Sequence, residues 1–503
     1  MPEPTAERWR LPAAKRLETA DLALWGLIGL AVTSIVIRPV VILLHAPHFL
    51  LNVDALITPA MAGVVLAWAL TRWRSLRFAE RLMTCSAAMM MTSVALSWMV
   101  GDPHSLASLA LGGALVPLLP LSLYLAVMAT HADTTDLARL TLVSMVLVQL
   151  AVGVVQYVAL RVAQIAPGGA DLVDGTTSHN FWPVFALPAC AALMLTSRDR
   201  YRLFWPIPVI LLAIYAEAKA ALVIWLPLLV VAVAILAFRT AVDHLRGPHP
   251  SRLTNAGSHL DLRARQGFAV ATLALIGLGI WWTPSVQGTW DVFLGHSRTL
   301  QEFTTTGEAG DATQPTLDDA IDLTTEHVMA TPDAFLFGLG PGNSTTHAAE
   351  ILARGSKNGV ALPPPGPVAR QLVAGEDVIH FRDAQSTLLG IWGDLGTIGA
   401  VIYLLNCAIA ATLLLLATWR RHKNALRAWS IPAVIGGTLV GGVLLDWPEQ
   451  SSVVIPTALV VVVLAGSASE RPSAFDRPSA ERGFRVIGGA GACDGVRSPA
   501  HRA

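Results

Sequence analysis

Three cationic side chains stand in or beside long apolar runs, where charges are rare. Arg38 in IVIRPVVILL and Arg161 in YVALRVAQI each lie a turn or two from one end of such a run. A charge at this depth is costly without a partner or water, so each arginine either marks a functional site or snorkels to the interface. Lys219, in AEAKAAL beside Glu217, is either a third such cation or an interfacial anchor. Two arginines at one membrane level favour an anion-binding site.

The glycine-rich stretch TPDAFLFGLGPGN offers a second kind of anion chemistry. Gly338, Gly340 and Gly342, with Pro341 among them, predict a tight turn with exposed backbone N–H groups. The turn is similar to an anion-cradling loop, but it lacks the Lys-Ser/Thr pair of a P-loop and follows no buried strand. Nucleotide binding is therefore not expected, and neither is a nucleic-acid partner.

Just before this turn, the segment PTLDDAIDLTTEHVMA predicts a helix. The apolar positions at helical spacing are Leu317, Ile321, Thr324 and Val328. Thr316 is the expected N-cap, and Asp318 and Asp319 fall in the first turn. Paired carboxylates are typical of catalytic sites, but acids are also stabilised at a helix N-terminus, and we favour that structural role here.

A cluster of titratable residues, His380, Arg382 and Asp383, leads into DAQSTLLGIWGDLGTIGAVIYLL. There a polar segment continues into an apolar helix without a linker. Two further acids, Asp446 and Glu449 in LLDWPEQSS, are interpreted as a solvated turn.

The elements that must position these residues are membrane helices. Hydrophobic residues make up 53% of the 503 residues, only 14% are charged, and the mean hydropathy is +0.55, whereas soluble proteins carry about 25% charged residues. Apolar runs long enough to cross a bilayer recur along the whole chain. They cover 20–44, 53–71, 79–100, 106–128, 137–165, 180–197, 202–216, 220–238, 267–283, 385–418, 430–446 and 450–466. We therefore predict an all-α polytopic membrane protein with about twelve transmembrane helices.

The distribution of Lys and Arg predicts the orientation. Alternate connections hold 27 of the 35 basic residues, the other set holds six, and two lie inside spans. By the positive-inside rule both termini are cytoplasmic and the long loop is extracytoplasmic. The predicted organisation is 1–283 (nine helices), 284–384 (a partly helical outer loop), 385–466 (three helices) and 467–503 (a disordered tail). None of the four cysteines has a neighbour at metal-ligand spacing, so no metal site is predicted.

Four stretches resemble the superfamily of O-antigen ligases and O-antigen and capsule polymerases. They are GTTSHNFWPVFALPA, AEAKAALVIWLPLL with Lys219 at the family's arginine position, the helix followed by PDAFLFGLGPGN, and the DAQSTLLGIWGDLGTIG stretch. In the last, Asp394, Gly396 and Gly399 stand in register with the family's Glu-Leu-Gly-x-x-Gly. Gly393, Gly396 and Gly399 either let the loop or substrate approach closely or serve helix packing.

The resemblance implies a glycosyltransferase of the GT-C type that uses a polyprenyl-diphosphate-linked glycan donor, needs no cofactor and acts at the outer face of the plasma (inner) membrane. The acceptor is a glycan or a lipid. Cations would stabilise the departing diphosphate. The candidates are Arg38, Arg161, Lys219, Arg298 and Arg382. His179 and Asn180, in SHN before the span at 180–197, either belong to the site or cap that helix.

The chain departs from the family pattern at the base. Gln385 and Ser386 occupy the family's His-Asn positions, and a neutral amide cannot accept the proton of the acceptor hydroxyl. Either Asp383, which we favour, or His380 takes that role, or the histidine is not essential, or the chain does not catalyse. Two other functions stay open: a transporter of a lipid-linked or other solute, and a non-catalytic relative in polysaccharide assembly.

Overall fold

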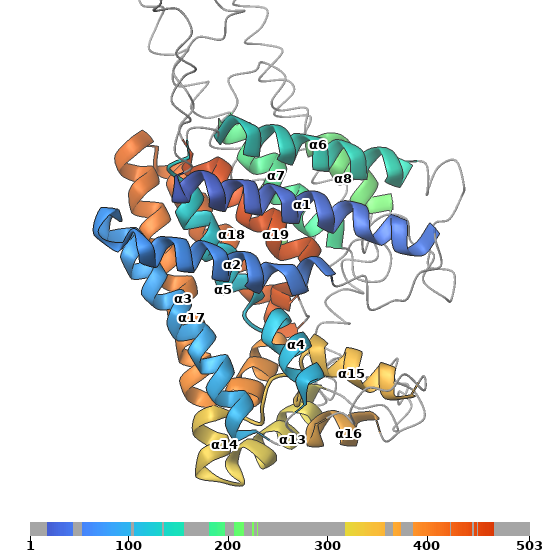
Figure 1. Ribbon diagram of the computed structural model, residues 1–503. Coiled ribbons are helices and arrows are strands. Elements are labelled where there is room, and N and C mark those ends of the chain that lie inside the picture. Colours follow the sequence, from blue (N-terminus) through green and yellow to red (C-terminus); the bar gives the residue numbers. More distant parts are fainter. Residues whose placement is uncertain are drawn as a thin grey trace, which may run out of the picture. The chain divides into compact units, whose positions relative to one another are not determined.

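The described part of the chain is helical. The computed structural model describes residues 18–43, 53–101, 105–132, 135–154, 181–196, 206–215, 224–225, 229, 317–357, 366–373, 386–422, 424–444, 447–449 and 451–466, and within them it contains no strand (Figure 1). The first eight α-helices are α1 (Thr19–Leu43), α2 (Val53–Thr71), α3 (Phe78–Val100), α4 (Leu106–Leu115), α5 (Leu118–Ala129), α6 (Thr135–Val154), α7 (Phe181–Thr196) and α8 (Pro206–Tyr215). The later ones are α13 (Leu317–Met329), α14 (Pro332–Phe337), α15 (His347–Lys357), α16 (Pro367–Val373), α17 (Thr387–His422), α18 (Ala425–Leu444) and α19 (Ser451–Ala465). Two 3₁₀ turns, η2 (Trp73–Ser75) and η7 (Trp447–Glu449), complete the described elements.

Several of these helices have the length and composition of membrane spans. Among the described residues, α2, α3 and α17 are long and apolar enough to cross a bilayer. The pair α4 and α5, bent by 50° at its junction, passes the same test as one broken span. These helices coincide with the predicted runs 53–71, 79–100, 106–128 and 385–418, so the helical fold class is confirmed for the described residues, and these four runs have the length and composition of membrane spans. The predicted runs at 220–238 and 267–283, and the tail at 467–503, lie outside the described residues, apart from positions 224–225 and 229.

The centre of the packed helices is formed by α5 and α19. Every residue of α5 is buried, as are all side chains of α19 from Val453 to Ala465. A helix that is apolar on all sides belongs in the interior of a protein or in a bilayer, and α19 packs against α1, α5, α6, α7 and α18. The apolar side chains of α5 and α19 are thus held by close packing and dispersion contacts with these neighbours.

The short helices α13 to α16 fold onto one end of the α3–α17 pair. Helices α13 and α14 pack on α17, α14 also touches α3, and α15 packs on α4 (Figure 1). The predicted helix in this loop is confirmed as α13, and its buried face matches the predicted one in part. Ala320, Thr324 and Val328 are buried, whereas Ile321 is 41% exposed, because the contact with α16 and α17 is centred on the Ala320 stripe.

Proline and glycine mark two local features of the fold. Pro367, the last residue of PPPGP, begins α16, where its missing N–H costs nothing because the first helical N–H has no partner within the helix. Helix α17, predicted as one uninterrupted span, has a break at Gly396, whose φ of 67° and ψ of −174° are not helical. The polar residues at the beginning of α17 are therefore separated by a kink from its long apolar part.

Candidate functional site

The glycine-rich turn between α14 and α15 is a tight structure, as its sequence predicted. Gly338, Gly340 and Gly342 have φ values of 84°, 99° and 79°, a region that side chains disfavour. The backbone of the turn pairs with α17: Leu339 N donates to Gly393 O at 2.8 Å, and Gly340 N donates to Asp394 O at 3.1 Å. The turn therefore binds α17 where that helix breaks.

Glycines on the facing elements let the turn approach backbone to backbone. A Cβ on Gly338 would lie 2.2 Å from Asp394 O, and one on Gly101, after α3, would lie 2.3 Å from Leu339 O. A Cβ on Gly112 of α4 would lie 2.5 Å from the carbonyl carbon of Pro341. The turn is thus enclosed by α3, α4 and α17.

Within α17, the glycines divide between loop contact and contact inside the helix. A Cβ on Gly393 would lie 2.5 Å from Ser344 Cβ, and one on Gly396 would lie 2.4 Å from Gly338 N. The expectation of close approach by the loop is therefore confirmed for Gly393 and Gly396. A Cβ on Gly399 would meet Leu395 of its own helix instead.

The anion that the turn holds is a carboxylate of the protein itself. Asp394 is fully buried. Its Oδ2 accepts hydrogen bonds from Gly342 N at 2.6 Å and Thr346 Oγ1 at 2.9 Å. Its Oδ1 accepts from Asn343 N at 3.0 Å, Ser344 N at 2.8 Å and Ser344 Oγ at 2.7 Å. We call Asp394 with its donors in residues 342–346 the carboxylate clasp.

The clasp limits what the turn can bind. Its N–H groups point at Asp394, so they do not serve a phosphate of a substrate, and the charges of a diphosphate must be met by other groups. The clasp is also anchored to α3, because Ser97 Oγ donates to the Asp394 carbonyl oxygen. In the sequence, Asp394 stands in register with a family motif, but no role was predicted for it. In the structure it joins the loop to α3 and α17.

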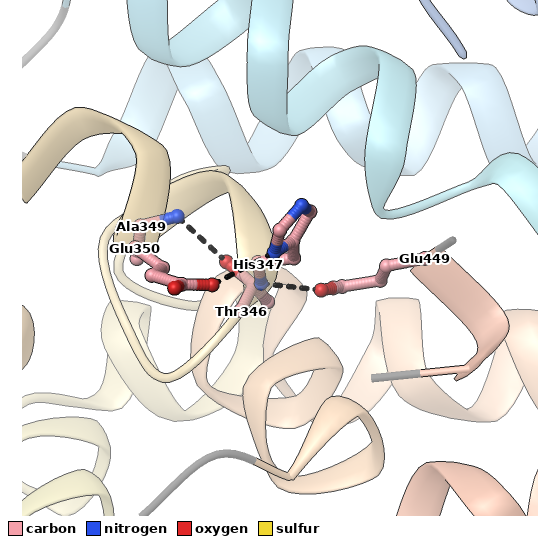
Figure 2. A network of polar contacts seen from close by, with 5 residues as sticks. All are labelled: Thr346, His347, Ala349, Glu350 and Glu449. Carbon is pink, nitrogen blue, oxygen red and sulfur yellow. Dashed lines mark hydrogen bonds and ion pairs between the residues drawn. The ribbon is translucent and has the colours of Figure 1, made fainter. Parts of the chain in front are cut away.

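Immediately after the clasp, α15 begins with a histidine between two carboxylates. Figure 2 shows Glu350 and Glu449 on opposite sides of His347. His347 Nδ1 lies 2.9 Å from Glu350 Oε2, and the backbone N–H of His347 donates to Glu449 Oε2. Both carboxylates are buried, with exposed fractions of 2% and 0%, whereas 15% of the His347 side chain is exposed. The imidazole is thus the part of this group that reaches the surface.

The His347–Glu350 pair has the geometry of an oriented general base. When Nδ1–H donates to a buried carboxylate, the ring is held in one tautomer and the lone pair is on Nε2. The carboxylate then stabilises the imidazolium that forms when Nε2 takes a proton, which is the division of roles in known His–carboxylate pairs. This pair was not predicted from the sequence, although the His-x-x-Glu spacing within a helix is a signal that could have found it.

The structure contradicts the interpretation of Glu449 as part of a solvated turn. Glu449 lies in η7, is fully buried and bonds to the start of α15, 102 residues away in sequence. The reason is that η7 packs against α5, α17, α18 and α19, which removes it from solvent. The neighbouring acid of that prediction, Asp446, lies outside the described residues.

An apolar cavity lies beside the clasp on the α3–α17 pair. Its volume is about 290 Å³. Phe337 comes from the end of α14, and Leu395 comes from the break in α17. The other principal lining residues are Met89, Thr92, Leu96 and Ile398. The cavity therefore lies between two candidate membrane helices, α3 and α17, and the residue that follows Asp394 lines it.

Most of the site residues predicted from the sequence lie outside the described residues. Gly338, Gly340 and Gly342 are described and form the turn. Arg38 belongs to α1, but its side chain is not described. The predicted residues outside the described ranges are Arg161, His179, Asn180, Lys219, Arg298, His380, Arg382, Asp383 and Gln385. Their roles stay predictions.

Comparison with known proteins adds no assignment. A scan against known protein families found no match, and a search of curated proteins found none. Within the described ranges, no three His, Cys, Asp or Glu side chains are grouped as a metal ion would require. What can be said of function therefore comes from the residues and their geometry.

Proposed function

We propose that this chain is a glycosyltransferase that acts at the extracytoplasmic face of the plasma (inner) membrane. It transfers a glycan from a polyprenyl-diphosphate-linked donor to a glycan or lipid acceptor. In this proposal the chain has about twelve spans in the plasma (inner) membrane, both termini are cytoplasmic and the loop at 284–384 is outside. The observation that carries the proposal is the His347–Glu350 pair, held where the loop meets the membrane helices.

In the proposed reaction, His347 Nε2 accepts the proton of the acceptor hydroxyl while the oxygen of that hydroxyl attacks the anomeric carbon of the donor. The bond between that carbon and the diphosphate oxygen breaks, and the diphosphate leaves with the electron pair. Glu350 stabilises the imidazolium that results, and the product has the inverted configuration. His347 thereby joins Asp383 and His380 as a candidate base, and it is the candidate whose oriented geometry supports the role.

Cationic side chains must stabilise the charge of the departing diphosphate, because the N–H groups of the turn already bind Asp394. Arg38, Arg161, Lys219, Arg298 and Arg382 remain the candidates, and the planar guanidinium of arginine suits paired phosphate oxygens. The apolar cavity at Phe337 and Leu395 offers a place for part of the donor's lipid chain. Polar chemistry and hydrocarbon would then meet at one edge of the bilayer.

The break in α17 is a feature that a transporter could also have, but its position supports the enzyme over the transporter. Transporters use broken helices at the bilayer midplane, and α17 is broken at Gly396. However, Asp394 beside this break bonds to Ser97, three residues before the end of α3 at Val100. A break level with the end of a span lies near the membrane surface, where an enzyme acting on a lipid headgroup needs its polar groups.

The experiment is a transfer assay on purified protein in nanodiscs, with a polyprenyl-diphosphate glycan, a series of acceptors and detection of released lipid diphosphate. His347→Gln should lower turnover by roughly 10²–10⁴-fold, the usual contribution of a general base. His327→Gln is the matched control, because it makes the same change in the same loop, on α13, and should leave turnover near the wild-type value.

Two results would overturn the proposal at different levels. Equal turnover of His347→Gln and wild type would remove His347 from the role of base and return it to Asp383 or His380. Wild-type protein that binds the donor but releases no lipid diphosphate with any acceptor would exclude the enzyme and favour the transporter or the non-catalytic relative.

A further inference from the structure

Two arginines and a histidine meet at the opposite end of the α3–α17 pair. Arg77 directly precedes α3, Arg421 lies at the end of α17, and His131 follows α5. Arg77 Nη1 lies 2.8 Å from His131 Nδ1, and Arg421 Nη2 lies 3.1 Å from the same atom. Guanidinium nitrogens only donate, so both hydrogen bonds require a neutral His131 that accepts at Nδ1. Burial, Arg77 and Arg421 lower the pKa of His131 to about 4.

An acid among the described residues, Glu80, lies beside Arg77, where its Oε2 accepts from the Arg77 backbone N–H at 2.8 Å. Within the described ranges, no ion pair joins the guanidinium of Arg77 or Arg421 to a carboxylate. Arg421 also donates to the carbonyl oxygens of Thr130 at 3.4 Å and Ala465 at 2.9 Å, which caps the ends of α5 and α19. The side chain of Arg77 contributes less to holding the helices together than that of Arg421, since it is exposed and bonds to His131. Like charges that share one acceptor favour an anion between them.

Aromatic side chains place this end at the depth of lipid headgroups. Trp68 lies in the last turn of α2, Trp419 precedes Arg421 by two residues, and Trp429 lies near the start of α18. Their exposed fractions are 38%, 46% and 63%, and Phe78, next to Arg77, is 78% exposed. Exposed tryptophans at one level of a helical membrane protein are typical of the membrane–water interface.

We propose that Arg77 and Arg421, held together by His131, bind the phosphate of an anionic phospholipid headgroup. The planar guanidinium donors match phosphate oxygens, and basic pockets between membrane helices are known places for anionic headgroups. The acyl chains would lie along the exposed apolar surface beside Phe78. This site is a helix-length away from the carboxylate clasp, at the other end of α3, so it stands or falls independently of the proposed reaction.

The test uses the full chain in nanodiscs of phosphatidylcholine with a minor share of phosphatidylglycerol. Native mass spectrometry measures the lipid that stays bound after release from the nanodisc. Wild type should retain phosphatidylglycerol above its share of the bilayer. Arg77→Gln should reduce this retention about fivefold, the effect expected for one basic residue near an anionic surface, and Arg77→Lys should reduce it less. The matched control is Arg74→Gln, which removes the same charge three residues earlier, in η2.

The outcomes distinguish a bound lipid from a free anion and from a cluster that only caps helices. Loss of phosphatidylglycerol in Arg77→Gln but not in Arg74→Gln supports the site. Equal retention in the two variants, or no enrichment in wild type, shows that the cluster only caps helices. A third arm adds millimolar inorganic phosphate. Displacement of the lipid by phosphate would show that the site takes a free anion, and the proposal of a lipid ligand would be wrong.

Discussion

Asp394→Asn is the change that most directly tests the carboxylate clasp. The substitution keeps the shape of the side chain and replaces one acceptor oxygen with an NH₂ group. Five donors face the carboxylate, three of them backbone N–H groups. In the better of the two amide orientations the remaining oxygen faces Asn343 and Ser344, and the NH₂ group faces the N–H of Gly342. One buried backbone donor is then left without an acceptor.

The expected cost follows from these bonds. A buried donor without a partner costs about 1–3 kcal/mol, and each of the three remaining bonds loses roughly 1 kcal/mol when its acceptor is no longer charged. The amide regains part of this loss, because a neutral group is less costly to bury than a carboxylate. The net destabilisation of the clasp is then roughly 2–4 kcal/mol, which is about a thirty- to several-hundredfold rise in its open population.

Hydrogen exchange followed by mass spectrometry measures that population at the amides of Gly342, Asn343 and Ser344. Their exchange in detergent-purified Asp394→Asn should be faster by the factor above, while amides of α2 should be unchanged. Asp333→Asn is the matched control, because Asp333 is an exposed acid on α14 in the same loop. Equal protection of the three amides in Asp394→Asn and wild type would refute the reasoning.

Three further predictions concern the turn, the topology and the opposite end of the helices. Gly338→Ala should destabilise the protein and slow transfer, because the φ of Gly338 is 84° and the new Cβ would lie 2.2 Å from Asp394 O. Gly63→Ala should do neither, because nothing lies within 4 Å of its new Cβ. Thermal unfolding followed by fluorescence compares the stability of the two variants. A cysteine placed near residue 310 should react with membrane-impermeant maleimide in intact cells and Cys493 should not, and the reverse labelling would invert the proposed topology. His131 should stay neutral down to about pH 4: its folded pKa lies below the usual value of 6.5, so its contribution to stability is complete above pH 6.5 and is lost as the pH falls through 4. Histidine NMR gives the midpoint, and a value near 6.5 would contradict the contacts with Arg77 and Arg421.

The candidate membrane helices of this protein were predictable because their signal is local. An apolar run of about twenty residues specifies a helix long enough for a bilayer, whatever its neighbours are. The runs at 53–71 and 79–100 therefore match α2 and α3 within one residue. The glycine-rich turn was predictable for the same reason, since Gly338, Gly340 and Gly342 report the backbone conformations of their own positions.

The partners of these elements depended on the tertiary structure. The turn's sequence indicates that its N–H groups can hold an anion, but the carboxylate that occupies them is 52 residues further along the chain. Glu449 looks like any acid in a short turn, and only the packing of η7 against four helices buries it and brings it to His347. Periodicity and propensity describe the chain over one or two helical turns, whereas the depth of a charge and the donors around it are decided by which distant segments pack together.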